Sequence, residues 1–224
     1  MTDTLTSVSF DIETTGFERS EIVTTVGFSL PLGCRLFVNT ADSSLAKGPV
    51  EERLETAFDI SIELSTHTTE SALLESIIEF GSEILGPREY LLVAFNGETF
   101  RGGFDLPFLR SRFATHDVQW PFYDVPYADL MPVFDSRFNT TVEDSKISDL
   151  ESVYDMLIGD GLTELDPFED SSEAVTAFEE QRIEPLLKHN VSDVLRTDAL
   201  ATLAERYCSK SEFKLKSLTP VSHR

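Results

Sequence analysis

Short apolar runs and longer helical periods alternate along the chain. Near the N-terminus, β-branched and aromatic residues form three runs separated by glycine and proline, which predicts a meander of three strands. These strands cover residues 5–12, 21–30 and 35–39. Leucine and isoleucine then recur at a helical period over residues 71–85, with acidic residues between them, and Gly86 and Pro87 end the pattern. The first half of the chain therefore combines strands with a helix.

The second half continues this mixture. Residues 90–95 form an apolar run that an Asn-Gly turn follows, which predicts a strand buried on both faces. Because the helix over residues 71–85 connects it to the first strand, we expect these two strands to be parallel. A fifth strand is predicted over residues 127–133, with Asp129 in its middle. Helices are predicted over residues 106–113, 147–158, 171–187 and 191–207, and a long loop over residues 159–168. This order indicates an α/β fold with a central mixed five-stranded sheet flanked by helices.

Two acidic residues, Asp11 and Glu13, lie at the end of the first predicted strand. Side chains alternate along a strand, so residues two apart point to the same face. Two carboxylates held that close repel each other unless a cation lies between them. The pair alone leaves two interpretations open: a metal-binding pair, or a carboxylate that faces solvent or caps the following turn.

Three short motifs carry a resemblance to a known superfamily. The run DIETTGF over residues 11–17 resembles the first motif of the DEDD superfamily of 3′ to 5′ exonucleases. FNG followed by FDLPFL, which contains Asp105, is similar to the second motif, and HNVSDVL, which contains Asp193, is similar to the third. All three occur in the family's order. The resemblance implies a ribonuclease H-like fold and an enzyme that shortens nucleic acid from a single-stranded 3′ end.

The resemblance also implies the roles of the site residues. Asp11, Glu13, Asp105 and Asp193 would hold two divalent ions, Mg²⁺ or Mn²⁺, because hard cations prefer carboxylate oxygens. Two ions would support hydrolysis of a phosphodiester bond. His189 would accept the proton of the attacking water, a task suited to an imidazole. A histidine in a predicted helix also caps or packs in many proteins, and this alternative stays open.

Substrate contacts follow from the same resemblance. The backbone near Thr14 and Gly16, with the ring of Phe17, would hold the terminal nucleotide, since an aromatic ring can stack on any base. A core role for Phe17 is the alternative. Asn96 would contact the nucleic-acid strand or close a turn.

The chain departs from the family pattern at two points. Residues 99–103 add a stretch between Asn96 and Asp105 that proofreading polymerases lack, which puts the role of Asn96 in doubt. Three residues separate His189 from Asp193, the spacing of the subgroup that has tyrosine in place of histidine. His189 therefore occupies a tyrosine's position.

The net charge is −22, from 40 acidic and 18 basic residues. Such a chain should be repelled by nucleic acid at low salt. An acidic chain with few lysines resembles proteins of salt-loving organisms. At 1 M salt the Debye length is about 3 Å, so repulsion between the negative charges is screened. An acidic interaction protein or nucleic-acid mimic is the alternative. Arginines near the second motif are candidates for phosphate contacts, with surface salt bridges as the alternative: Arg101, Arg110 and Arg112.

The sequence predicts one domain over residues 1–207 and a basic tail over residues 208–224 that either is a solvated end or grips nucleic acid. No signal peptide or membrane span is expected, so we predict a cytoplasmic protein. Cys34 and Cys208 show no metal-ligand spacing.

Taken with the resemblance, these features predict a stand-alone 3′ to 5′ exonuclease that acts on DNA or RNA. Two alternatives remain open at this stage. One is a ribonuclease H-like structure-specific endonuclease with the same carboxylates. The other is a non-catalytic nucleic-acid-binding module that has kept the fold.

Overall fold

The computed structural model describes residues 5–221 except 42, 87–88, 99–102 and 171, and it contains a seven-stranded mixed sheet. The strands lie in the order β4-β3-β2-β1-β5-β6-β9. Their bounds are β1 Thr6–Thr14, β2 Val23–Leu30, β3 Gly33–Asn39, β4 Ile62–His67, β5 Tyr90–Ala94, β6 Pro126–Asp129 and β9 Lys216–Ser217. β1, β2 and β3 form an antiparallel meander and β1 pairs in parallel with β5, so both predictions are confirmed. A separate hairpin joins β7 Thr141–Val142 to β8 Ser145–Lys146.

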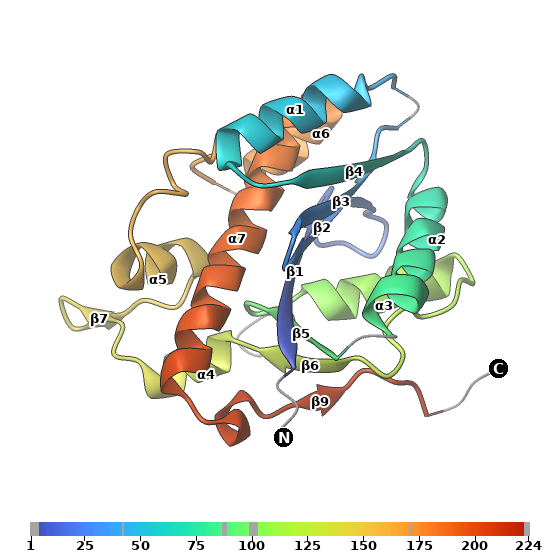
Figure 1. Cartoon of the computed structure of the whole chain (residues 1–224). Helices are drawn as coiled ribbons and strands as arrows, with labels where there is room; N and C mark the ends of the chain where they lie inside the picture. The colour runs from blue at the N-terminus through green and yellow to red at the C-terminus, as the bar shows by residue number, and fades with distance from the viewer. Residues whose placement is uncertain (1–4, 42, 87–88, 99–102, 171, 222–224) are drawn as a thin grey trace.

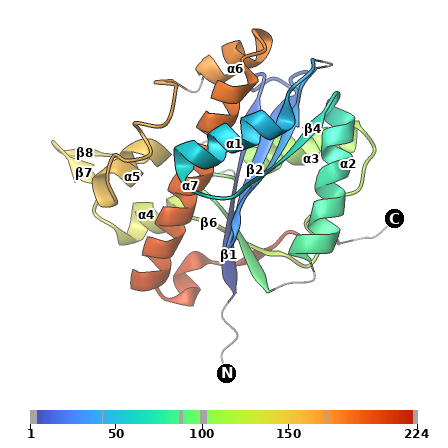
Figure 2. The same cartoon turned by 45° about the horizontal axis from the view of Figure 1, so that its top comes forward.

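Helices cover both faces of the sheet (Figures 1 and 2). α2 and α3 pack on one face, whereas α7 runs across the other face along β1 and β2. α1 and α6 lie near one end of α7, and α4 and α5 lie toward its other end. The bounds are α1 Lys47–Phe58, α2 Glu70–Phe80 with a π-helical extension Gly81–Leu85, α3 Asp105–Thr115, α4 Met131–Arg137, α5 Leu150–Leu157, α6 Ser172–Glu179, α7 Ile183–Tyr207 and a 3-10 turn Lys210–Phe213. None of the described helices is long and apolar enough to cross a membrane.

The sheet has two strands more than the five predicted, because the sequence pattern did not predict β4 and β9. α1 and β4 form a crossover that places β4 parallel to β3. α1 buries only Val50, Leu54 and Phe58, one residue per turn, and so narrow an apolar stripe does not stand out in the sequence. β9 has only two residues.

The strand predicted over residues 127–133 is wrong in its second half. β6 ends at Asp129 and α4 begins at Met131. Asp129 Oδ1 accepts hydrogen bonds from the backbone N–H groups of Asn96 at 2.9 Å and Met131 at 3.1 Å. Asp129 therefore lies at the end of its strand, where it holds the turn after β5.

The two C-terminal helices divide at a different residue than predicted. α6 ends at Glu179 and α7 begins at Ile183, instead of a break near residue 188. Gln181 has a φ of 59°, a left-handed conformation that ends a helix. Pro185 falls in the first turn of α7, where its missing N–H removes no hydrogen bond. His189 and Asp193 therefore lie in one continuous helix.

Part of the predicted tail packs on the sheet. β9 pairs antiparallel with β6, and Leu218 is buried. The carbonyl of Leu218 accepts a hydrogen bond from Trp120 Nε1 at 3.1 Å. The division into a domain of residues 1–207 and a tail of residues 208–224 remains a prediction.

Candidate metal centre

β1 presents its polar side chains to α7. Val8, Phe10 and Ile12 pack in the core beneath α2 and α3, so alternation turns the odd-numbered side chains toward α7. A row of polar pairs joins β1 to α7: Ser7 with Glu205, Ser9 with Asp198, Asp11 with Asn190, and Glu13 with His189. Two acids at the end of one strand thus face the helix that carries the third motif.

Asp105 and Asp193 reach the same place from two helices. Asp105 is the first residue of α3, whose start is tied to the turn after β5 by a 2.8 Å hydrogen bond from the Leu106 N–H to the Gly97 carbonyl. Asp193 lies on α7, one turn after His189. The four predicted carboxylates and His189 line one hollow, although they span 183 positions of sequence, from 11 to 193 inclusive.

Three carboxylates in this hollow, those of Asp11, Glu13 and Asp105, are costly to ionise. Burial, followed by the charges of Glu13, Asp105 and Asp193, raises the pKa of Asp11 well above its usual value. Burial also raises the pKa of Glu13 to about 7, although the charge of His189 opposes this shift. The pKa of Asp105 is raised well above its usual value by burial and then by Glu13. Acids with such raised pKa values gain most from a cation placed among them.

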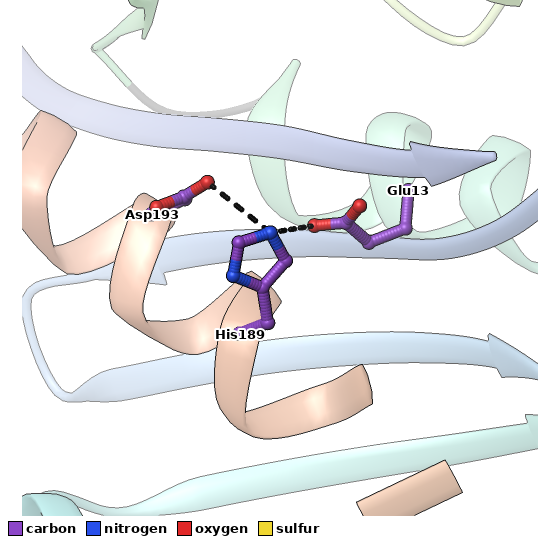
Figure 3. Close-up of side chains that lie close together, drawn as sticks. All are labelled: Glu13, His189 and Asp193. Atoms are coloured by element: carbon purple, nitrogen blue, oxygen red, sulfur yellow. Dashed lines mark ion pairs between the residues drawn. The ribbon is translucent and has the colours of Figure 1, made fainter. Parts of the chain in front are cut away.

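His189 lies between two of the carboxylates (Figure 3). Its Nε2 is 3.8 Å from Glu13 Oε1 and 3.9 Å from Asp193 Oδ2. Burial of the ring opposes its protonation and is the largest single influence. The hydrogen bond to Asp166 and the charges of Glu13 and Asp193 together outweigh burial and raise the pKa of His189 to about 10. The surrounding carboxylates therefore favour the protonated form of the ring when no metal ion is bound.

The donor set fits divalent cations. Glu13 and Asp193 offer carboxylate oxygens that lie within 4.8 Å of each other and of a ring nitrogen of His189, and Asp11 and Asp105 line the same hollow. Carboxylate oxygens suit Mg²⁺ and Mn²⁺. The choice between these two ions stays a prediction.

Asn190 contacts the candidate centre, although the resemblance implied no role for it. It is fully buried on α7, and its Nδ2 donates a 3.0 Å hydrogen bond to Asp11 Oδ2. The approach of α7 depends on Gly27, which lies opposite Asp11 in β2. A Cβ at Gly27 would lie 2.2 Å from Asn190 Oδ1 and 2.9 Å from Val194 Cγ2.

Gly27→Ala is therefore expected to push α7 away from the sheet. We expect a loss of about 1–3 kcal/mol in the free energy of unfolding, as in other overpacked cores, with weaker Mn²⁺ binding. Urea denaturation and calorimetric Mn²⁺ titration measure these effects. Gly48→Ala is the matched control, because a Cβ there meets nothing within 4 Å. Equal stability of the two variants would contradict this account of Gly27.

Asp166 and Arg196 contact residues of the candidate centre, and neither lies in the three motifs. Asp166 contacts His189 Nδ1 with both carboxylate oxygens, at 2.9 and 3.0 Å. Arg196 Nη1 contacts Asp166 Oδ2 at 2.7 Å and Asp193 Oδ1 at 2.6 Å. Burial favours a higher pKa for Asp166, but the contacts with His189 and Arg196 outweigh it and lower this pKa. Arg196 had a sequence signal, since it follows Asp193 by three residues on the same helix face.

The predicted nucleotide-binding turn lies at the rim of the hollow. Thr14 Oγ1 donates to the Gly16 carbonyl at 2.9 Å, and Gly16 has a φ of 148°. Phe17 is 81% exposed, and its ring meets Phe104 edge-on with 5.0 Å between centroids. Phe17 is therefore not a core residue, and its ring is accessible to a base.

Asn96 closes a turn and also lines the hollow. It has a φ of 63°, and its backbone N–H donates to Asp129. Its side-chain Oδ1 is buried and has no hydrogen-bond partner within the described part of the chain. The structure thus gives Asn96 a turn role through its backbone, and substrate contact by its side chain stays a prediction.

The three candidate arginines have different environments. Arg112 is buried, with Nε and Nη2 at 2.8 and 2.5 Å from the carboxylate of Glu70, so it forms an internal ion pair. Arg110 is exposed, lies 3.7 Å from Glu98 and stacks over Trp120. Arg101 lies outside the described residues.

A mixed sheet whose first strand ends at clustered carboxylates, completed by acids from two helices, defines a ribonuclease H-like protein. The family model described as RNase H superfamily matches residues 8–205, a span that includes all four carboxylates. The chain therefore belongs to the RNase H superfamily, and the predicted ribonuclease H-like fold is confirmed. Nucleases of this superfamily generally use divalent metal ions. No match was found among curated proteins.

Proposed function

We propose that the protein is a metal-dependent 3′ to 5′ exonuclease of the DEDD type that hydrolyses DNA or RNA. One observation carries the proposal: the acids of three sequence motifs, Asp11 and Glu13, Asp105 and Asp193, line a single hollow with His189. Three separate elements, β1, α3 and α7, bring these like charges together, and such an arrangement is costly unless cations lie among the carboxylates.

Within this proposal each residue has a definite task. The four carboxylates hold the metal ions. When bound there, two divalent ions would supply activation of a water and stabilisation of the leaving 3′ oxygen of the phosphodiester. His189 accepts the water proton at Nε2, the ring atom that faces Glu13 and Asp193.

The raised pKa of His189 is compatible with a role as base in the loaded enzyme. The charges of Glu13 and Asp193 help to keep the ring protonated in the metal-free protein. Cations bound by the same carboxylates would offset those charges. We therefore expect metal binding to lower the pKa of His189 toward the working pH, where a base is most effective.

The exposed ring of Phe17 supports action at a strand end. Edge-on contact with Phe104 leaves a face of Phe17 available for stacking beside the carboxylates. Stacking requires an unpaired base, as at a single-stranded 3′ end. A site that takes an end in this way yields mononucleotides.

Product analysis tests the proposal. Single-stranded DNA and RNA labelled at the 5′ end are digested with Mn²⁺ or Mg²⁺, alongside circular strands of the same sequence. We expect a ladder that shortens from the 3′ end, release of mononucleotides and intact circles. Cleaved circles would instead identify an endonuclease. Tight binding without cleavage under any metal and salt condition would identify a binding module.

We also propose that the protein is adapted to high salt. The motivating observation is the net charge of −22, whose self-repulsion opposes both compaction and nucleic-acid binding. Raising KCl from about 0.1 M to about 1 M shortens the Debye length from roughly 10 Å to 3 Å. The melting temperature and the turnover rate should rise or hold over this range.

Thermal melts and initial rates across the KCl series measure this effect. A variant with Glu52→Gln and Glu179→Gln, both exposed, should show a weaker dependence of the melting temperature on salt. Highest stability and activity in dilute buffer would contradict salt adaptation and favour an acidic nucleic-acid mimic.

A further inference from the structure

We propose that Asp166 and Arg196 are positioning residues of the metal centre. Asp166 fixes the ring of His189, and Arg196 fixes the carboxylate of Asp193. The inference rests on the proposed function, because both residues act through groups that would carry out the hydrolysis. Neither residue belongs to the three motifs.

Asp166 determines which nitrogen of His189 faces the carboxylates. It lies in the irregular segment between α5 and α6, and its side chain is 3% exposed. Both of its oxygens lie within 3.0 Å of Nδ1, so Nδ1 must carry a proton. A neutral ring held in this way is the Nδ1–H tautomer, and its free lone pair is on Nε2. That atom points between Glu13 and Asp193 (Figure 3).

Arg196 connects this pair to Asp193. Its side chain is 1% exposed, and Nη1 contacts Asp166 Oδ2 and Asp193 Oδ1. Asp193 therefore has one oxygen committed to Arg196, while its Oδ2 is turned toward His189 at 3.9 Å. The guanidinium is rigid and planar, so it sets the orientation of the Asp193 carboxylate.

The contacts form a closed circuit of four side chains, in which His189, Asp166, Arg196 and Asp193 each contact the next and Asp193 lies near His189. His189, Asp193 and Arg196 lie on successive turns of one face of α7, and Asp166 reaches them from a loop. A circuit of this kind holds a base and a metal ligand in a fixed relation. Replacing a residue that orients a metal-site side chain typically lowers metal affinity or activity by 10- to 100-fold.

A purely structural role, in which Asp166 only anchors its loop to α7, predicts different results. It predicts that replacements lower stability and that the remaining folded protein has normal kcat. If the two residues position the centre, the folded variants themselves should be impaired, and replacing Asp166 should have a different effect from replacing Arg196. Asp166 should affect turnover, whereas Arg196 should affect metal affinity.

The first measurement needs no variant of either residue. In the metal-free wild-type protein, nitrogen–proton NMR spectra of the four histidines should contain a slowly exchanging Nδ1 proton at low field. His189→Gln assigns the signal by its loss. If His189 shows no such protected proton, the proposal is wrong, whether or not the protein cleaves nucleic acid.

The variants then separate the two roles. Asp166→Asn should shift or remove the His189 Nδ1 proton signal and lower kcat by roughly 10²- to 10⁴-fold, with KM and Mn²⁺ affinity near those of wild type. Arg196→Lys keeps the charge but not the planar fork, and it should weaken Mn²⁺ binding by roughly 10- to 100-fold. Calorimetric titration with Mn²⁺ alone measures the latter.

Glu151→Gln is the matched control. Glu151 lies 3.4 Å from Arg196 Nη2, is 43% exposed and contacts neither His189 nor Asp193 in the described structure. It should match wild type in kcat, Mn²⁺ affinity and the histidine spectrum. Wild-type kcat per folded molecule in Asp166→Asn, together with wild-type Mn²⁺ affinity in Arg196→Lys, would overturn the proposal. An inactive wild type would overturn the proposed function, while the spectrum and the Mn²⁺ titrations would still test the positioning.

Discussion

Asp11→Asn is expected to abolish metal-dependent hydrolysis and to stabilise the metal-free protein. Loss of a ligand should remove several kcal/mol of transition-state stabilisation, a fall in turnover of at least about 10³-fold. The stabilisation has a separate cause. Burial and the neighbouring charges of Glu13, Asp105 and Asp193 raise the pKa of Asp11, so ionising it in the folded protein costs free energy that asparagine avoids.

The pH dependence of stability follows from the same shifts. A folded-state pKa above the unfolded value means that the folded protein holds its proton more tightly, so stability falls as pH rises between the two values. For Glu13 this window extends from 4.5 to about 7. In chelator above this window, Asp11→Asn and Glu13→Gln should each be more stable than wild type, by on the order of 1–3 kcal/mol.

Asp193→Asn should have the opposite effect on stability. Asp193 is a partner of the buried Arg196, and removing one partner of a buried cation is destabilising. Glu52→Gln, an exposed acid on α1, is the control for a general loss of negative charge. Urea denaturation with and without chelator measures all four variants. If Asp11→Asn unfolds, or Asp193→Asn is as stable as Asp11→Asn, the assignment of the centre is wrong.

His189→Ala is expected to lower turnover by roughly 10²- to 10⁴-fold, the usual contribution of a positioned base. Mn²⁺ binding should survive, because the four carboxylates remain. His189→Tyr should restore part of the rate if a phenol can serve in this position, which matches the tyrosine spacing of the third motif. Since a phenol has an ordinary pKa near 10, the pH–rate profile should lose any limb that belongs to the imidazole.

The pH–rate profiles of wild type, His189→Ala and His189→Tyr at saturating metal test whether His189 is the general base. His189→Gln provides a further comparison, because it keeps a polar side chain at this position without a base. Near-normal activity of His189→Ala would show that the histidine is a bystander. The base would then have to be another group.

Local periodicity explains why the sequence predicted residues that the structure brings together in one hollow. Asp11 and Glu13 are two apart on a strand, and His189 and Asp193 are four apart on a helix, so each pair shares a face whatever the tertiary fold. The resemblance to the superfamily then predicted that Asp105 lies in the same site as these two pairs. Such information is local, and it does not depend on how the elements pack.

The residues that support the centre depend on tertiary packing and were not found. Asp166 lies in a correctly predicted loop, but no pattern in a loop indicates which side chain turns inward across 23 positions to His189. Asn190 contacts Asp11 across 179 positions, and it fits only because Gly27 has no side chain. The break between α6 and α7 was misplaced because both flanking segments have helical sequences, and a single left-handed residue, Gln181, ends α6.

We propose above all that Asp11, Glu13, Asp105 and Asp193 form a two-metal site. Anomalous diffraction from crystals grown with Mn²⁺ and a nucleoside 5′-monophosphate tests it most directly. We predict two Mn²⁺ peaks within the hollow lined by these carboxylates in the wild-type protein, and the loss of at least one peak in Asp11→Asn. A hollow without Mn²⁺ at saturating concentration, or the same two peaks in Asp11→Asn, would contradict it.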